Sequence, residues 1–259
     1  MVFLNIFKEA KQDILCDNLL AMADDELKRL VDNYRPNQKV LAGLTDIRVL
    51  GTVGPSASGK TTLMKALVKI SPKFKFILDE TSRAPRPGEI NGQDFLFRTK
   101  EEILADLEKE ELVQIAIGPN GDLYCTRLSS YSNWATGVIA LVPAAFREFR
   151  KLPIKFFRAA FIVPKTFEIW QKWLAKQAKA GDWTEEKLHS RLAEAKTSYK
   201  FALADKDIYF VLNDDIDKAV NRLLQIAVSQ APADESRAKA VAKENYAKLL
   251  ELLNKSSNL

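Results

Sequence analysis

Residues 46–70 read DIRVLGTVGPSASGKTTLMKALVKI, and this stretch decides the fold. Its apolar beginning, Asp46 to Val53, predicts a buried strand, and TTLMKALVKI predicts a helix that ends at Ser71-Pro72. Between them, GPSASGKT (residues 54–61) matches the pattern G-x-x-x-x-G-K-[ST] at every position. A strand, a glycine-rich loop and a helix in this order are the context that a phosphate-binding loop requires.

The residue types in this loop suit a nucleotide triphosphate. Glycines let backbone N–H groups curl around an anion, and the following helix adds its positive N-terminal end. The Lys60 ammonium group is placed to reach the β- and γ-phosphates, and the Thr61 hydroxyl to ligate Mg²⁺. We therefore expect ATP with Mg²⁺ to bind at these residues: Gly54, Pro55, Ser56, Ala57, Ser58, Gly59, Lys60, Thr61 and Thr62.

The composition is that of an ordinary globular protein. The chain has 259 residues, a net charge of +5 and 47% hydrophobic residues. It has no dense Lys/Arg run, so we do not expect it to bind nucleic acid. Cys16, Cys125 and the single His189 lack metal-ligand spacing. Charges interrupt the apolar N-terminal run, which argues against a membrane span or signal peptide and favours the cytoplasm.

Predicted strands and helices alternate along the chain, which indicates an α/β fold with a parallel sheet. Thr99 and Glu102 form a capping box for a helix over 99–110, and Pro119-Asn120-Gly121-Asp122 favours a hairpin of 112–117 with 123–127. A polar loop is expected over 81–94. The other expected strands are 74–78, 138–142, 159–163 and 208–212; the other expected helices are 1–34, 166–204 with a break at Gly181-Asp182, 215–229 and 234–254.

Beyond the loop, residues 46–227 resemble guanylate kinases. Three segments carry the resemblance: GPSASGKTTL (54–63), TSRAPRPGEINGQDFLF (81–97) and FIVPKTFEIW…RLAEAK…YFVLNDDIDKAVNRLL (161–224). The resemblance implies a three-layer P-loop fold around a central parallel sheet. It also implies a small mixed α/β monophosphate-binding region at about 79–133 and a helical lid at about 165–192. Helical extensions at 1–45 and 228–259 lie outside it.

The implied reaction is transfer of the ATP γ-phosphoryl group to a nucleoside monophosphate, with GMP or dGMP as the default acceptor. This chemistry depends on positioning and charge neutralisation. Arg83 and Arg86 match two arginines that grip the acceptor phosphate, and Glu89 matches an acid that orients their loop. Arg191 matches a lid arginine that neutralises the transferring group, so Lys60, Arg83 and Arg191 form the expected catalytic set. The other matches are Tyr124 at the acceptor phosphate, Thr126 near its base and Asn213 near the ATP adenine.

The chain departs from the family pattern at several positions. Ala57 replaces a glycine and is a point of expected strain, and Phe95 replaces a tyrosine that contacts the acceptor phosphate. At the base-reading positions Asp79 replaces a serine and Gln114 a glutamate, and no acid stands within 141–145. In the lid, Trp173 and Gln177 replace arginines, while Lys176 and Lys179 are candidate substitutes that lack a guanidinium fork.

Three functions therefore stay open: a GMP or dGMP kinase, a kinase of the same fold with another acceptor base such as adenine, and a weakly catalytic ATP-binding or protein-interaction module. The intact Gly59-Lys60-Thr61 favours an enzyme. The terminal helices have three open roles, which are covering the core, forming a homo-oligomer or binding a partner, and core covering is the favoured one.

Overall fold

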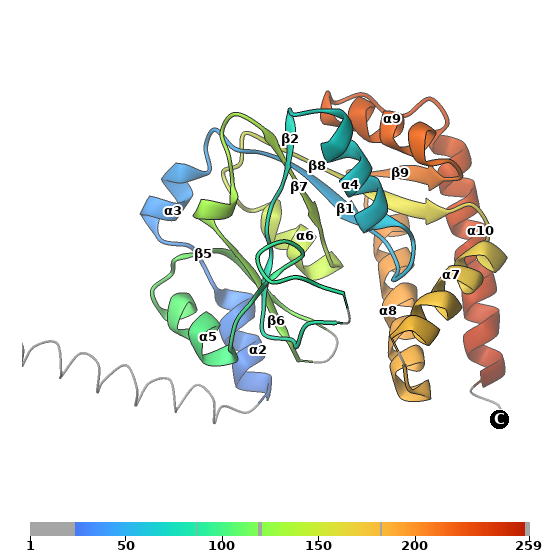
Figure 1. Ribbon diagram of the computed structural model, residues 1–259, viewed down its shortest axis with the longest axis horizontal. Coiled ribbons are helices and arrows are strands. Elements are labelled where there is room, and N and C mark those ends of the chain that lie inside the picture. Colours follow the sequence, from blue (N-terminus) through green and yellow to red (C-terminus); the bar gives the residue numbers. More distant parts are fainter. Residues whose placement is uncertain (1–23, 87, 119–120, 182, 257–259) are drawn as a thin grey trace, which may run out of the picture. The chain divides into compact units, whose positions relative to one another are not determined.

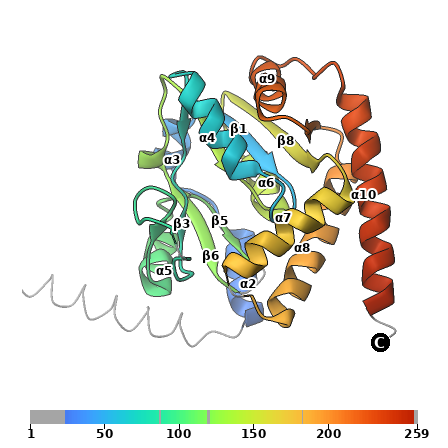
Figure 2. The ribbon, with the colours of Figure 1, turned by 45° about the vertical axis from the view of Figure 1, so that its right-hand side comes forward.

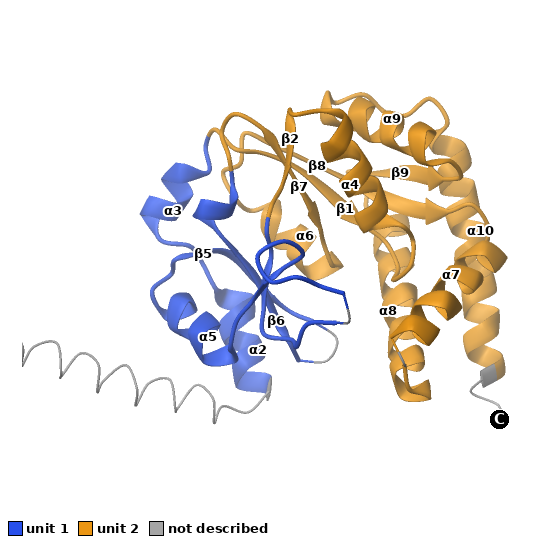
Figure 3. Ribbon diagram, in the orientation of Figure 1, with its two compact units in different colours: residues 1–45, 78–131 blue, residues 46–77, 132–259 orange. Residues whose placement is uncertain are grey.

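The computed structural model describes residues 24–86, 88–118, 121–181 and 183–256, so most of the helix expected over 1–34 lies outside the described residues. The chain divides into two compact units (Figure 3). The larger comprises residues 46–77 and 132–259, and the smaller comprises residues 1–45 and 78–131. Within the described part of the chain, no helix is both long and apolar enough to cross a membrane.

A five-stranded parallel sheet forms the centre of the larger unit, in the order β2-β7-β1-β8-β9 (Figure 1). Strand β1 lies between β7 and β8, which both come later in the sequence. The carboxyl end of β1 is therefore a topological switch point, where α/β proteins bind ligands. The phosphate loop follows β1 directly. The strands are β1 (Arg48–Val53), β2 (Phe74–Phe76), β7 (Thr136–Ala140), β8 (Phe156–Pro164) and β9 (Ile208–Asn213).

Helices cover both faces of this sheet, which confirms the expected three-layer α/β fold. On one face, α4 (Lys60–Ile70) and α9 (Ile216–Ala227) share an aliphatic core with the strands that includes Leu50, Leu63 and Leu223. On the other, α6 (Pro143–Phe149) and α8 (Glu185–Ala204) pack through aromatic pairs such as Phe161 with Tyr199, at 5.1 Å between ring centroids. Two helices complete the unit, α7 (Phe167–Ala180) and α10 (Glu235–Ser256); α10 runs along α8 and β9 (Figure 2).

The smaller unit is a mixed four-stranded sheet, in the order β4-β3-β6-β5, with helices on one face. The expected hairpin is present, because β5 pairs antiparallel with β6, and the expected capping box of Thr99 and Glu102 begins α5. Side chains from α2, α5 and the hairpin form its apolar core, which includes Leu27, Ile103 and Ile115. The elements are α2 (Asp24–Asn33), α3 (Gln38–Gly43), β3 (Glu80–Thr81), β4 (Leu96–Phe97), α5 (Lys100–Glu108), β5 (Leu112–Ile117) and β6 (Leu123–Arg127).

Three elements differ from the sequence-based expectation. The segment 143–149 forms α6, although its seven residues are too few to show helical periodicity; burial of Phe146 and Phe149 selects the helix. Helix α3 is shorter still, with Asn37 as its cap. Thr81, expected at the beginning of a polar loop, belongs instead to β3, because it pairs with Tyr124 of β6.

A buried network of four charged residues joins the smaller sheet to α5. Arg98 donates to Glu80 at 2.9 Å and to Asp106 at 2.5 Å, and Arg127 contacts the same two carboxylates. Burial raises the pKa of both Glu80 and Asp106, while Arg98 opposes that rise. Arg98 therefore lowers, but does not cancel, the cost of ionising these two buried carboxyl groups.

We expect Arg98→Leu to destabilise the protein by roughly 3–5 kcal/mol, because it leaves buried carboxylates short of a partner. Without Arg98 the carboxyl pKa values rise further, so the native state holds protons that the unfolded chain releases. Stability of the variant should then fall as pH rises above the ordinary carboxyl range. Urea unfolding at pH 5 and pH 8 measures this, with Arg98→Lys as the control that keeps the charge. A loss of the same size at both pH values would contradict the network's role.

Candidate active site

The phosphate loop connects the carboxyl end of β1 to the first turn of α4 through backbone conformations that suit glycine. Gly54 has φ 149° and Gly59 has φ 93°, and Gly59 caps the N-terminus of α4. A Cβ atom at Gly59 would lie 2.3 Å from the Asn213 amide nitrogen, so that position has no room for a side chain. The loop therefore needs its two glycines for both conformation and space.

Ala57 occupies the position where the family pattern has glycine, and it carries the expected strain. Its φ is 61°, in the left-handed region that residues with a Cβ atom avoid at a cost of about 1 kcal/mol. The loop keeps this conformation because neighbouring groups hold its carbonyl oxygens. The Lys60 ammonium group donates to Gly54 O at 2.7 Å and to Pro55 O at 2.9 Å.

Two side chains from distant parts of the sequence hold the same loop. Asn213, at the end of β9, donates its amide N–H to Ser58 O at 2.9 Å. Its role was expected at the ATP adenine, and the structure places its amide against the loop. Trp170 of α7 donates its indole N–H to Ser56 O at 2.8 Å. Nothing in the local sequence pattern reveals this contact, which joins residues 114 positions apart.

The free polar groups of the loop fit a magnesium-bound triphosphate. Thr61 and Thr62 are exposed on the first turn of α4, where the helix N-terminus favours an anion. Ser58 Oγ is enclosed and has no hydrogen-bond partner among the described residues. The exposed hydroxyl of Thr61, the predicted metal ligand, could therefore hold Mg²⁺. The neighbouring Lys60 folds back onto the carbonyl oxygens of Gly54 and Pro55.

In the smaller unit, the predicted acceptor residues share one face of the sheet. Gln114 is the partner of Thr126, and Tyr124 is the partner of Thr81, so these four side chains point to the same side. Burial and then the charge of Asp79, which directly precedes β3, raise the pKa of Tyr131, so the Asp79 carboxyl group lies near this set of side chains. The opposite face packs on α2 and α5. One sheet thus separates an apolar core from a polar, largely buried site.

Arg83 is held in place by an acid and an aromatic ring. Its two terminal nitrogens donate to the two carboxylate oxygens of Glu89, both at 2.7 Å, and its guanidinium lies 4.6 Å from the Phe95 ring centroid. Burial opposes the charge, but the Glu89 contacts raise the pKa of Arg83. Glu89 also accepts from the Arg86 backbone N–H at 2.8 Å. Glu89 therefore contacts both predicted phosphate-binding arginines.

The base-reading positions form a second polar group on this face. Thr126 and Tyr131 share a hydrogen bond of 2.7 Å between their hydroxyls, and Tyr131 was missed by sequence reasoning. Burial, followed by repulsion from Glu80, raises the pKa of Asp79 well above its ordinary value. Gln114 is 3% exposed, and its Oε1 atom has no hydrogen-bond partner among the described residues. This group offers hydroxyls, an amide and a carboxyl group whose pKa is raised.

The lid helices carry less free positive charge than the family pattern. Arg191 of α8 is buried; it donates to Glu194 at 2.6 Å and lies 5.8 Å from the Trp183 ring centroid. Trp173 is 37% exposed, where the pattern has an arginine. Lys176 and Lys179, the candidate substitutes, are exposed on α7.

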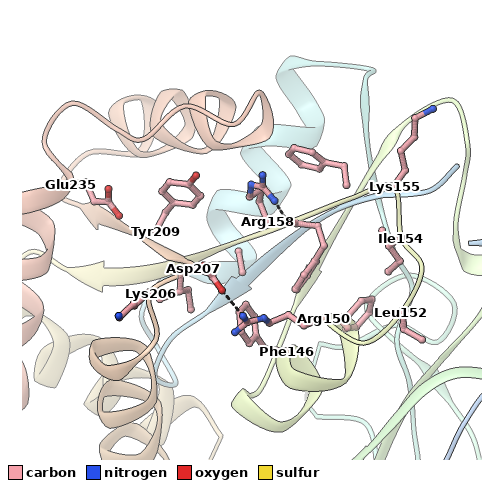
Figure 4. A pocket seen from close by; sticks show the side chains of 15 residues that line it. Phe146, Arg150, Leu152, Ile154, Lys155, Arg158, Lys206, Asp207, Tyr209 and Glu235 are labelled. Atoms are coloured by element: carbon pink, nitrogen blue, oxygen red, sulfur yellow. Dashed lines mark hydrogen bonds and ion pairs between the residues drawn. The ribbon is translucent and has the colours of Figure 1, made fainter. Parts of the chain in front are cut away.

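A pocket of about 630 Å³ lies at the amino ends of β8 and β9, the end opposite to the phosphate loop (Figure 4). Parallel α/β sheets bind ligands at the other end of their strands. Arg150 on its wall already contacts Asp205 and Asp207, and Lys155 contacts Asp46. None of the predicted site residues lines this pocket.

A phosphate loop at the switch point of a parallel sheet defines a P-loop nucleotide-binding protein. Comparison with known proteins agrees. Residues 47–230 match the family model described as guanylate kinase, and this chain belongs to that family. It is 31% identical to a guanylate kinase of Synechocystis over 194 residues, which cover 74% of this chain and 96% of the relative.

Other relatives give the same result. A guanylate kinase of Wolbachia from Brugia malayi is 33% identical over 176 residues, which cover 66% of this chain and 87% of the relative. The crystal structure of guanylate kinase from Anaplasma phagocytophilum has the same fold, with a TM-score of 0.51 and 19% identity, covering 73% of this chain and 88% of that one. The matched region ends before α10.

We expect Lys60→Ala to abolish turnover and to weaken Mg·ATP binding far more than it alters folding. The reason is that Lys60 supplies the cation at the loop that is placed for the β- and γ-phosphates. Calorimetric titration and thermal melting of the variant measure the two effects. Lys69→Ala, an exposed lysine on the same helix, is the control. Unchanged ATP affinity would contradict the assignment of the loop.

Proposed function

We propose that this enzyme transfers the γ-phosphoryl group of Mg·ATP to the phosphate of GMP or dGMP. The observation that carries the proposal is Arg83, fixed by Glu89 and Phe95 on the face of the sheet that also holds Tyr124 and Thr126. Glu89 takes one N–H from each terminal nitrogen of Arg83, and the Nε–H, which has no partner among the described residues, remains for a phosphate monoester. The names of the relatives support the guanine nucleotide as acceptor.

In this proposal, an oxygen of the acceptor phosphate attacks the γ-phosphorus of ATP. The bond from that phosphorus to the β–γ bridging oxygen breaks, and ADP leaves with the bond's electrons. Lys60 and the loop N–H groups hold the donor phosphates, Arg83 and Arg86 hold the acceptor, and Arg191 neutralises the transferring group. Magnesium held at Thr61 would supply further positive charge at the β- and γ-phosphates.

We assign one role to each region. Residues 79–133 bind the acceptor and residues 165–192 act as the lid. Segments 1–45 and 228–259 are extensions that lie outside the guanylate kinase region. We also infer a cytoplasmic location, which the buried free thiol of Cys125 supports.

The raised pKa of Asp79 bears on the choice of base. A guanine offers an acceptor at O6, so a site that reads it needs a donor there. An ionised carboxylate would repel O6, but a protonated carboxyl has an O–H and can donate, as the serine of the family pattern does. Gln114 can accept from guanine N1–H through the Oε1 atom that lacks a partner. Both residues are thus compatible with GMP.

A second candidate acceptor is a purine with an amino group at position 6. It is favoured if Asp79 is ionised during turnover, because the carboxylate then accepts from the amino group, and if Gln114 turns its amide to donate to an unprotonated N1. The absence of an acid within 141–145 also removes a partner for the guanine N2 amino group. The guanine and 6-aminopurine acceptors therefore require different protonation states of Asp79 and different orientations of the Gln114 amide.

We expect Arg83→Lys to raise KM for the acceptor about tenfold or more and to leave KM for ATP nearly unchanged, because lysine keeps the charge but lacks the fork. Arg83→Ala should have a larger effect of the same kind, and Arg86→Lys should resemble Arg83→Lys. Steady-state kinetics with each substrate varied in turn separates the constants. Arg29→Lys, exposed on α2, serves as control. An effect confined to ATP would contradict the acceptor role.

We expect kcat/KM for GMP to exceed that for AMP and to fall as pH rises, because Asp79 loses its donor hydrogen on ionisation. A buried group left without its partner costs roughly 1–3 kcal/mol, which corresponds to a tenfold to hundredfold loss. The Asp79→Ser variant should lack this pH dependence, and it controls for titration of the nucleotides themselves. The measurement is a panel of GMP, AMP, their deoxy forms and pyrimidine monophosphates between pH 6.5 and 9. A higher efficiency with AMP would overturn the guanine assignment.

A further inference from the structure

Helix α10 packs on the helix and strand that lead into the lid, although it lies outside the matched family region. It contacts α8, β9, α7 and β8 (Figures 1 and 2). Its side chains Ala238, Ala242 and Leu249 are fully buried, as expected for a helix that covers the core. This contact agrees with the core-covering role that the sequence favoured.

One buried side chain of α10 is polar. Asn245 is 1% exposed and donates its amide N–H to Pro164 O at 2.9 Å. Asparagine is a weak helix former, and burying an amide is unfavourable unless it is hydrogen-bonded. Pro164 is the last residue of β8, two residues before Thr166 caps the N-terminus of α7. The amide therefore holds the point where the strand turns into the lid helix.

The same short segment reaches the phosphate loop from its other end. Thr166 begins α7 by accepting from Ile169 N–H, and one turn later Trp170 is fully buried with its indole N–H on Ser56 O. Trp170 follows Pro164 by six positions, which is less than two helical turns. A displacement at Pro164 reaches the indole through a short segment that Thr166 caps and that the buried Phe167 and Trp170 side chains fix.

We propose that Asn245 is a positioning residue for ATP binding. By holding Pro164 O, it fixes the beginning of α7 so that Trp170 keeps the Ser56 carbonyl in place. That carbonyl belongs to the peptide bond that joins Ser56 to Ala57, whose left-handed conformation is unfavourable without external support. The inference rests on the proposed use of ATP, and it gives the C-terminal helix a part in that step.

The amino end of α10 is anchored independently of the lid. Asp234, just before α10, accepts from Arg222 of α9 at 3.0 and 2.6 Å, and Glu235 accepts from the Phe210 backbone N–H at 3.2 Å. Lys248 also contacts Glu168 of α7, but that pair is exposed and contributes little. Asp234→Asn therefore weakens the attachment of α10 without touching the β8–α7 junction, and it is the matched control.

The experiment measures Mg·ATP affinity by calorimetry, in the absence of an acceptor, for full-length variants. We expect Asn245→Asp, which cannot donate when ionised, to weaken affinity roughly tenfold, since small misplacements of binding groups have effects of this size or larger. KM for the acceptor should not change. Asp234→Asn should lower the melting temperature and leave ATP affinity unchanged at a temperature where the variant is folded.

A double-mutant cycle tests the route through the indole. Trp170→Phe removes the indole N–H donor. Adding Asn245→Asp to this variant should weaken ATP binding no further, because both changes release the Ser56 carbonyl. Asn245→Ala replaces Asn245→Asp in the cycle if the charged variant does not fold. Additive effects, or an Asn245 variant with wild-type affinity, would overturn the inference. If Lys60→Ala also left ATP affinity unchanged, the proposed function itself would be wrong.

Discussion

The phosphate loop adopts a backbone that is unfavourable by itself, and much of the larger unit is arranged to hold it. Gly54, Ala57 and Gly59 all have positive φ, and at Ala57, which has a Cβ atom, this conformation costs about 1 kcal/mol. Three side chains offset this by donating to loop carbonyls: Lys60 from within, Asn213 from β9 and Trp170 from α7. In the sheet, β9 lies beside β8, and β8 lies beside β1; with this order Asn213 at the end of β9 contacts the loop that follows β1.

Features that depend on a few neighbouring residues could be predicted from the sequence. The phosphate loop, the Thr99–Glu102 capping box and the hairpin were predicted, because each is specified by local spacing. Contacts between distant segments could not be predicted. The Trp170 indole meets Ser56 across 114 residues, and Tyr131 meets Thr126 only because the chain turns back after β6. Helix α6 was missed for the same reason, since its conformation depends on burial of Phe146 and Phe149.

Two adjacent acids of the smaller unit, Asp79 and Glu80, have different neighbours. Glu80 faces the packed side, where Arg98 and Arg127 contact it and oppose the rise of its pKa. Asp79 faces the polar side, where burial and repulsion from Glu80 both raise its pKa. The neighbouring carboxyl groups thus have different surroundings: Glu80 is contacted by two arginines, and Asp79 lies near the Tyr131 hydroxyl.

In the proposed lid of α7 and α8, Trp173 stands where the family pattern has an arginine, and two other tryptophans make contacts of another kind. Trp170 serves the loop through its indole N–H, and Trp183 lies against the guanidinium of Arg191. Arg191 is also paired with Glu194, so it presents a neutralised charge until a stronger partner arrives. The oxygens of a phosphoryl group in transfer carry more negative charge than a single carboxylate. Charge-assisted hydrogen bonds from a guanidinium to these oxygens are therefore strong. In the proposed mechanism, the Arg191–Glu194 pair keeps the guanidinium ordered until it exchanges Glu194 for the phosphoryl group in transfer.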